Sequence, residues 1–141
     1  DYSVEGKSDE RLFDSTKKEI LRTITRAHQD DFIPFAVFKM TGAASVEILE
    51  KISSGAKLSR AEEEEWSRAR ARVGEICEYA HSLGQPVFID AEESWIQDAI
   101  DALATEMLEK YNREKPIVYN TVQLYRIDRL SFLKSSHEQA L

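Results

Sequence analysis

Three apolar runs of this sequence each end in a polar side chain that could bind a ligand. The first run ends at Lys39, the second at Asp90 and the third at Gln123. An ammonium group, a carboxylate and an amide offer different binding chemistry, and each stands where a hydrophobic segment stops. If the three runs are neighbouring strands of one sheet, the three side chains converge on a single mouth.

Short apolar runs alternate with amphipathic segments along the chain. The runs are rich in β-branched and aromatic residues, which is typical of buried strands, whereas the segments between them repeat apolar residues three and four positions apart. Residues 1–4 could be the tail of a further strand. The predicted strands are 32–40, 86–90 and 116–123, and the predicted helices are 8–29, 43–54, 59–83, 93–111 and 126–140.

This alternation predicts the α/β class, with about four parallel strands and covering helices. Such a set makes an incomplete open sheet or about half of an eight-stranded barrel. Side chains alternate along a strand, so each terminal polar residue shares a face with the residue two positions earlier. Because ligands of parallel α/β proteins bind outside the carboxyl ends of the strands, we expect the polar residues at the ligand-binding edge.

Each polar residue also has a plain structural interpretation. Lys39 could end a hydrophobic strand as a solubilising residue, and Gln123 could satisfy nearby backbone groups. Asp90 could cap the helix that is predicted to start at Glu93, and that role is compatible with ligand binding. Glu92 and Glu93 are interpreted as favourable charges in the first turn of that helix rather than as metal ligands.

Composition narrows the function classes. The 141 residues carry a net charge of −7, which argues against a nucleic-acid partner, and the length matches a single domain. Cys77 is the only cysteine, which excludes an intrachain disulfide, and we interpret it as a small buried helix residue. None of the three histidines has a metal-ligand spacing, so no metal is predicted. No apolar run approaches the ~20 residues of a transmembrane helix.

Three stretches resemble the proline dehydrogenase family: PFAVFKMTG, VFIDAEESWIQDAIDALATEMLEKYN and KPIVYNTVQLYRIDRLSFLK. The resemblance is closest to the single-function bacterial and mitochondrial type. It implies a distorted (βα)8, TIM-like barrel that binds FAD and oxidises L-proline to Δ1-pyrroline-5-carboxylate. Residues 1–141 resemble only the first half of that barrel, roughly strands one to four. The expectation is therefore one partial barrel domain, a fragment of the enzyme that is inactive in isolation.

The resemblance implies roles for individual residues. Lys39 matches the family's strand-two lysine, which lies near the flavin and helps to bind the substrate carboxylate. Asp90 matches the strand-three aspartate of the polar network around lysine, flavin and substrate. Gln123 matches the glutamine that hydrogen-bonds to the isoalloxazine ring, and Asp1 matches an acidic residue close to the substrate nitrogen. Tyr125 follows the glutamine as the family pattern expects.

The resemblance also implies partners and a location. L-proline is the expected substrate, a quinone or another molecule is the expected electron acceptor, and the bacterial cytoplasm is the expected compartment. Peripheral association of the parent enzyme with the inner face of the membrane and self-association of the fragment are left open. Because the chain opens on Asp1 rather than Met, we expect further residues upstream.

Two alternative functions are considered. A lysine at the end of a barrel strand can form a Schiff base with a carbonyl substrate, which would make Lys39 a nucleophile. A half-barrel could instead be a non-catalytic module whose open edges and apolar face pair with another chain.

Overall fold

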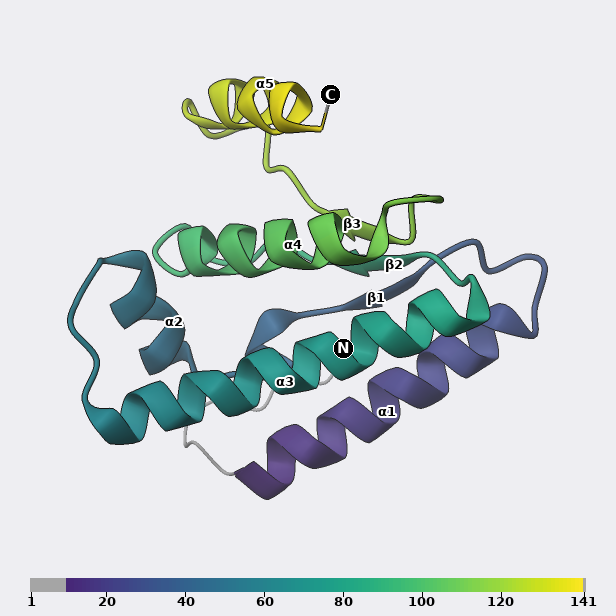
Figure 1. The fold of residues 1–141 in the computed structure, drawn as a ribbon, viewed down its shortest axis with the longest axis horizontal. Coiled ribbons are helices and arrows are strands. Elements are labelled where there is room, and N and C mark those ends of the chain that lie inside the picture. The colour runs from purple at the N-terminus through teal and green to yellow at the C-terminus, as the bar shows by residue number, and fades with distance from the viewer. Residues whose placement is uncertain (1–9, 141) are drawn as a thin grey trace.

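The computed structural model describes residues 10–140 and confirms the α/β class (Figure 1). Three parallel strands form a sheet in the order β1-β2-β3, and the further strand suggested for residues 1–4 lies outside the described residues. The strands are β1 (Ala36–Phe38), β2 (Val87–Ile89) and β3 (Val118–Asn120). The helices are α1 (Glu10–His28), the 3₁₀ turn η1 (Met40–Gly42), α2 (Val46–Ser53), α3 (Arg60–Leu83), α4 (Gln97–Tyr111) and α5 (Arg129–Gln139).

The strands are shorter than the sequence predicts, and the helix after β2 starts later. Each strand has three residues. Pro34 has no N–H for a ladder, and the carbonyl of Lys39 accepts from the N–H of Gly42 in a 3₁₀ turn, so β1 is confined between them. α4 begins at Gln97 rather than Glu93, because side-chain hydrogen bonds hold the preceding residues in a loop.

The helices α1, α3 and α4 cover one face of the sheet. Ala36, Val87 and Val118 lie side by side in the parallel register, and all three are buried. They share one apolar core with residues from these three helices. The long helix α3 contacts both α1 and α4, and Figure 1 shows α1 and α3 running beside each other.

The opposite face of the sheet carries an aromatic cluster. Phe88 and Tyr119 are half-buried, and Val37, which is aligned with them, is 53% exposed. Phe35 completes the cluster, because its ring centroid lies 4.5 Å from that of Phe88 and 5.3 Å from that of Tyr119. The sheet therefore has one face buried under helices and one apolar face that is only partly covered.

α3 begins and ends at the two signals that the sequence predicts. Ser59 and Glu62 form a capping box, in which the N–H of Ser59 donates to the Glu62 carboxylate at 2.8 Å and the N–H of Glu62 donates to Ser59 Oγ at 3.4 Å. At the other end Gly84 adopts the left-handed conformation with φ of 64°. Both predicted boundaries are confirmed.

The glycines at the end and in the middle of α3 are expected to respond oppositely to alanine. Gly84→Ala forces a side chain into the left-handed region and should cost about 1 kcal/mol. Gly74 lies inside the helix, and a Cβ there meets no atom within 4 Å, so Gly74→Ala should stabilise by up to about 1 kcal/mol. Urea unfolding of the two variants measures this difference, and shifts of the same sign would contradict it.

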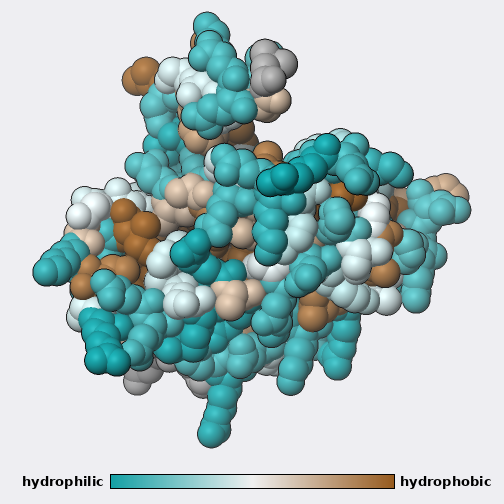
Figure 2. Space-filling view, viewed as in Figure 1, coloured by the Kyte–Doolittle hydropathy of each residue, from teal (hydrophilic) through white to brown (hydrophobic). Residues whose placement is uncertain are grey.

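α5 stands apart from the other helices, and residues 121–128 lead to it without helix or strand (Figure 1). Arg129, its first residue, anchors it to α4 through a buried ion pair with Asp101. Figure 2 shows hydrophobic residues where this helix meets the rest of the molecule. Large apolar side chains are exposed on α5 and on the segment before it: Leu124, Tyr125, Ile127, Leu130 and Leu133.

Candidate functional site at the carboxyl edge of the sheet

Lys39 and Asp90 are neighbours at the carboxyl edge of the sheet. Phe38 and Ile89 are paired in the register, so the residues that follow them leave adjacent strands at the same level. The N–H of Asp90 donates to the carbonyl of Phe38 at 2.9 Å, which extends the ladder to this position. Lys39 is exposed and Asp90 is half-buried. The edge therefore presents a cation and an anion from adjacent strands.

Gln123 reaches the same edge from beyond β3. Its Nε2 donates at 2.8 Å to the carbonyl of Glu92, which lies two residues after Asp90. Thr121 donates from Oγ1 to the carbonyl of Ile89 at 3.0 Å and holds this segment against the end of β2. The Oε1 of Gln123 is buried and has no hydrogen-bond partner among the described residues. An unpaired buried acceptor is costly, so a ligand N–H would be stabilised there.

Asp90 does not cap α4, so that structural interpretation is wrong. The helix starts too far along the chain, and its N-cap position is occupied by Ile96, which offers no side-chain hydrogen bond. The Oδ1 of Asp90 instead accepts from the N–H of Ala91 at 3.0 Å. This contact fixes the direction of the carboxylate at the strand end.

Glu92 joins the loops after β1 and β2. The interpretation of Glu92 and Glu93 as first-turn charges is wrong, because both precede α4, whose first-turn acid is Asp98. The Glu92 carboxylate accepts from the N–H of Thr41 at 3.0 Å and from its Oγ1 at 2.6 Å. Burial raises the pKa of Glu92, while the Thr41 hydrogen bonds and the charge of Lys39 oppose that rise.

Cys77 lies in the core and takes no part in this edge. It is fully buried in α3, as predicted, and burial raises its pKa to about 12, so the thiol stays protonated. Asp1, the expected substrate-binding acid, lies outside the described residues. Between residues 10 and 140, no group of three or more His, Cys, Asp or Glu side chains could hold a metal ion. No helix in that range is long and apolar enough to cross a membrane.

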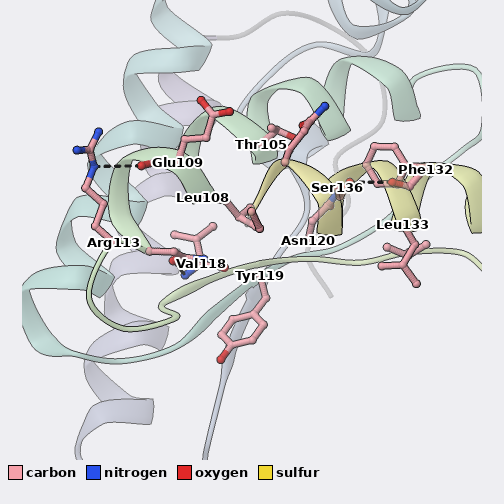
Figure 3. Close-up of a pocket in the computed structure, with 14 residues that line it drawn as sticks. Thr105, Leu108, Glu109, Arg113, Val118, Tyr119, Asn120, Phe132, Leu133 and Ser136 are labelled. Atoms are coloured by element: carbon pink, nitrogen blue, oxygen red, sulfur yellow. Dashed lines mark hydrogen bonds between the residues drawn. The ribbon is translucent and has the colours of Figure 1, made fainter.

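A groove of about 960 Å³ lies elsewhere, between α4, β3 and α5 (Figure 3). Leu108, Val118 and Phe132 give it an apolar lining. Figure 3 shows the ring of Tyr119 directed away from α5, toward the partly covered face. The predicted site residues within the described part of the chain do not line this groove. The groove lies on the α4 and α5 side of β3 and reaches the carboxyl end of that strand at Asn120 and Val122.

The edge combines three chemical capabilities. The ammonium group of Lys39 can bind a carboxylate, Asp90 offers hydrogen-bond acceptors, and the unpaired Oε1 of Gln123 can accept from a buried N–H. The partly covered apolar face beside them suits an aromatic ring system. These features describe an α/β protein whose parallel sheet carries polar groups capable of ligand binding at its carboxyl edge.

The comparison with known families identifies which α/β family this is. The family model described as proline dehydrogenase matches residues 1–141. The chain therefore belongs to the proline dehydrogenase family, which confirms the resemblance noted in the sequence.

Known relatives are similar over different shares of their length. The carbapenem antibiotics biosynthesis protein CarD of Pectobacterium carotovorum subsp. carotovorum is 36% identical over 140 residues, covering 99% of this chain and 37% of that protein. The mitochondrial proline dehydrogenase 1 of Dictyostelium discoideum is 28% identical over 177 residues, covering 98% and 31%. That of Arabidopsis thaliana is 41% identical over 73 residues, covering 50% and 15%. The chain thus spans about a third of the first two relatives. No solved structure matches it.

Proposed function

We propose that residues 1–141 are one partial (βα)8-barrel domain of a longer, FAD-dependent proline dehydrogenase. The whole protein oxidises L-proline to Δ1-pyrroline-5-carboxylate, and residues outside this chain complete the barrel. The single observation that carries the proposal is the adjacency of Lys39 and Asp90 on paired parallel strands, with the Gln123 amide at the same edge. Family membership supports the same reading.

Lys39 is the residue that binds the substrate carboxylate in this proposal. Lys39 directly follows β1 at the carboxyl edge of the sheet. A positive charge fixed there holds an anionic group in one orientation. Asp1 would lie close to the substrate nitrogen. A substrate held at its carboxylate presents its ring carbon in a constant position.

Asp90 and Gln123 shape the surroundings of the reacting atoms. Asp90 supplies a carboxylate one strand from Lys39, which balances the lysine charge and orients donors in the site. The buried acceptor of Gln123 fits an N–H of the isoalloxazine ring. When bound, FAD accepts the hydride that leaves the carbon next to the proline nitrogen. The chain's residues would hold the substrate as its neutral amine, so that loss of the hydride gives a protonated imine, which then releases its N–H proton to water to give the product.

The electron acceptor of the whole protein is proposed to be a quinone or a similar molecule. A bacterial protein of this kind would work in the cytoplasm. If it uses a quinone, it would act at the inner face of the membrane. The names of the relatives from Dictyostelium discoideum and Arabidopsis thaliana give their location as mitochondrial. The acceptor and the location are proposed from family membership, whereas the residues of the carboxyl edge bear only on the binding of substrate and flavin.

A second candidate function is association with another chain. The apolar side chains around α5 and the partly covered aromatic face favour it, because exposed apolar surfaces promote association. In the first proposal the remainder of the same polypeptide covers these surfaces. Size-exclusion chromatography of residues 1–141 distinguishes the two proposals: a defined, colourless oligomer supports association as the role of this segment.

The absorbance spectrum of the whole protein tests the first proposal. We expect a visible flavin band that bleaches on anaerobic addition of L-proline. Pyrrolidine, which has the ring nitrogen but no carboxylate, should bleach the band far more slowly because Lys39 cannot hold it. A purified, folded protein that neither contains nor takes up FAD, or whose band is unchanged by proline, would contradict the proposal.

A further inference from the structure

A line of hydrogen bonds connects Gln123 to a buried carboxylate on α4. Gln123 Nε2 donates to the carbonyl of Glu92 at 2.8 Å, and the N–H of Glu92 donates to Oε1 of Gln97 at 2.8 Å. Gln97 Nε2 then donates to Oδ1 of Asp101 at 2.9 Å. Gln97 is 1% exposed and Asp101 5%. Gln97 and Asp101 of α4 are therefore connected to the loop that contains Glu92, the hydrogen-bond partner of Gln123.

Asp101 is a fixed end for this line. Its Oδ1 also accepts from Nδ2 of Asn120, the last residue of β3, at 2.9 Å, and its Oδ2 accepts from the Arg129 guanidinium. The carboxylate thus has donors on both oxygens and a cation beside it, which satisfies a charge in the interior. Because its partners come from β3, α4 and α5, Asp101 cannot turn without breaking contacts in three elements.

The orientation of each amide along the line follows from its partners. A carboxylate only accepts, so Gln97 must turn Nε2 toward Asp101 and therefore Oε1 toward the N–H of Glu92. Held there, Glu92 presents its carbonyl, which also only accepts, so Gln123 must turn Nε2 toward it. The Oε1 of Gln123 is then left as the buried acceptor without a partner among the described residues.

A second contact holds the middle of the line. The Glu92 side chain is bound by Thr41 through two hydrogen bonds, so both the backbone and the carboxylate of this residue are fixed. A glutamine amide on an unrestrained loop could present either its oxygen or its nitrogen to a ligand. Here the Glu92 carbonyl takes the nitrogen and leaves the oxygen for a ligand, and the contacts of Thr41 and Gln97 hold that carbonyl in place.

We propose that Gln97 and Asp101 are positioning residues that fix the Gln123 amide with Oε1 toward the ligand, so that the site selects a ring N–H. The inference rests on the proposed function, in which the ligand group is the imide N3–H of the isoalloxazine ring. Gln97 and Asp101 touch neither substrate nor cofactor; they act through Glu92. Their role is to hold the Glu92 carbonyl where it fixes the Gln123 amide.

Two flavins test the proposal: FAD and N3-methyl-FAD, which lacks the imide N–H. Both are titrated into the flavin-free whole protein, and dissociation constants are measured by flavin fluorescence. The unmodified protein should bind FAD at least about tenfold more tightly than N3-methyl-FAD, the effect of one buried hydrogen bond. Gln97→Met should weaken FAD binding and bring the ratio of the two constants close to one, because the amide is no longer oriented.

Asn112→Ala is the matched control. It removes the hydrogen bonds that Asn112 makes to the backbone of Ile117 and Val118 at the opposite end of β3. That variant should lose stability but keep the ratio of the two flavin affinities. Where Gln97→Met does not fold, Asp101→Asn tests the same line and is expected to lose the same discrimination.

Two results would overturn the inference in distinguishable ways. Equal affinity of the unmodified protein for both flavins, with FAD still reduced by proline, rejects the oriented acceptor and leaves the proposed function standing. Failure to bind either flavin rejects both. A Gln97→Met protein that keeps the full discrimination shows that Gln123 is oriented without α4.

Discussion

In the whole protein proposed above, Lys39→Met is expected to slow reduction of the bound flavin by L-proline at least ~100-fold, the usual scale for loss of a preorganised charge at a reacting centre. Met keeps the unbranched shape and most of the length of the side chain and removes its charge, so the substrate carboxylate loses its cation. Pyrrolidine has no carboxylate, so its slow oxidation should be nearly unchanged by the substitution. Stopped-flow measurement of flavin bleaching at saturating FAD gives both rates.

Lys18→Met is the matched control for that experiment. Lys18 is exposed on α1, which covers the face of the sheet opposite the aromatic cluster, and its loss should leave both rates unchanged. If Lys39→Met slows proline and pyrrolidine equally, the lysine does not act through the carboxylate. If reduction by proline stays normal, the role assigned to Lys39 is wrong.

Arg129→Met is expected to lower the free energy of unfolding by about 3–5 kcal/mol, the range for breaking a buried ion pair from one side. The side chains of Arg129 and Asp101 are each 7% exposed, so the substitution leaves an uncompensated carboxylate in the interior. Asp128 also pairs with Arg129, but it is 50% exposed and regains water. The midpoint of urea unfolding, with an unchanged slope, measures the loss.

Arg113→Met provides the comparison. Arg113 is exposed at the end of α4, where its Nε donates to the carbonyl of Glu109 at 3.3 Å, and its loss should change stability by less than about 0.5 kcal/mol. Adding Asp101→Asn to Arg129→Met should recover part of the loss, since the stranded charge is removed. Equal midpoints for the two arginine variants would show that the buried pair contributes nothing.

The order of strands and helices was predictable because it depends on local pattern. Periodicity marked α1, α2, α3 and α4, and the boundaries of α3 followed from Ser59 and Gly84, whose effects act within one turn. The start of α4 was not predictable in this way. Its preceding loop is held by Gln97, which in the sequence is simply one more polar residue of an amphipathic segment.

The site was predictable where it depends on the sheet and unpredictable where it depends on packing. Parallel strands put their carboxyl ends together, which is why Lys39 and Asp90 could be expected near each other. The bridging role of Glu92 required knowing that Thr41 lies opposite. One signal was present in the sequence: Thr41 follows Lys39 by two positions, and Glu92 follows Asp90 by two. A contact between residues 51 positions apart, however, leaves no local pattern in the sequence.

The hydrogen bond from the N–H of Asp90 to the carbonyl of Phe38 has a consequence for variation among relatives. The separation between the two oppositely charged positions is inherited from the spacing of adjacent strands, about 4.8 Å, rather than from the rotamers or helices around them. Helices on the far side of the sheet can therefore diverge, lengthen or repack while the distance between lysine and aspartate stays constant. The geometry of the proposed site is in this sense a property of the backbone, and it changes little when the covering helices change.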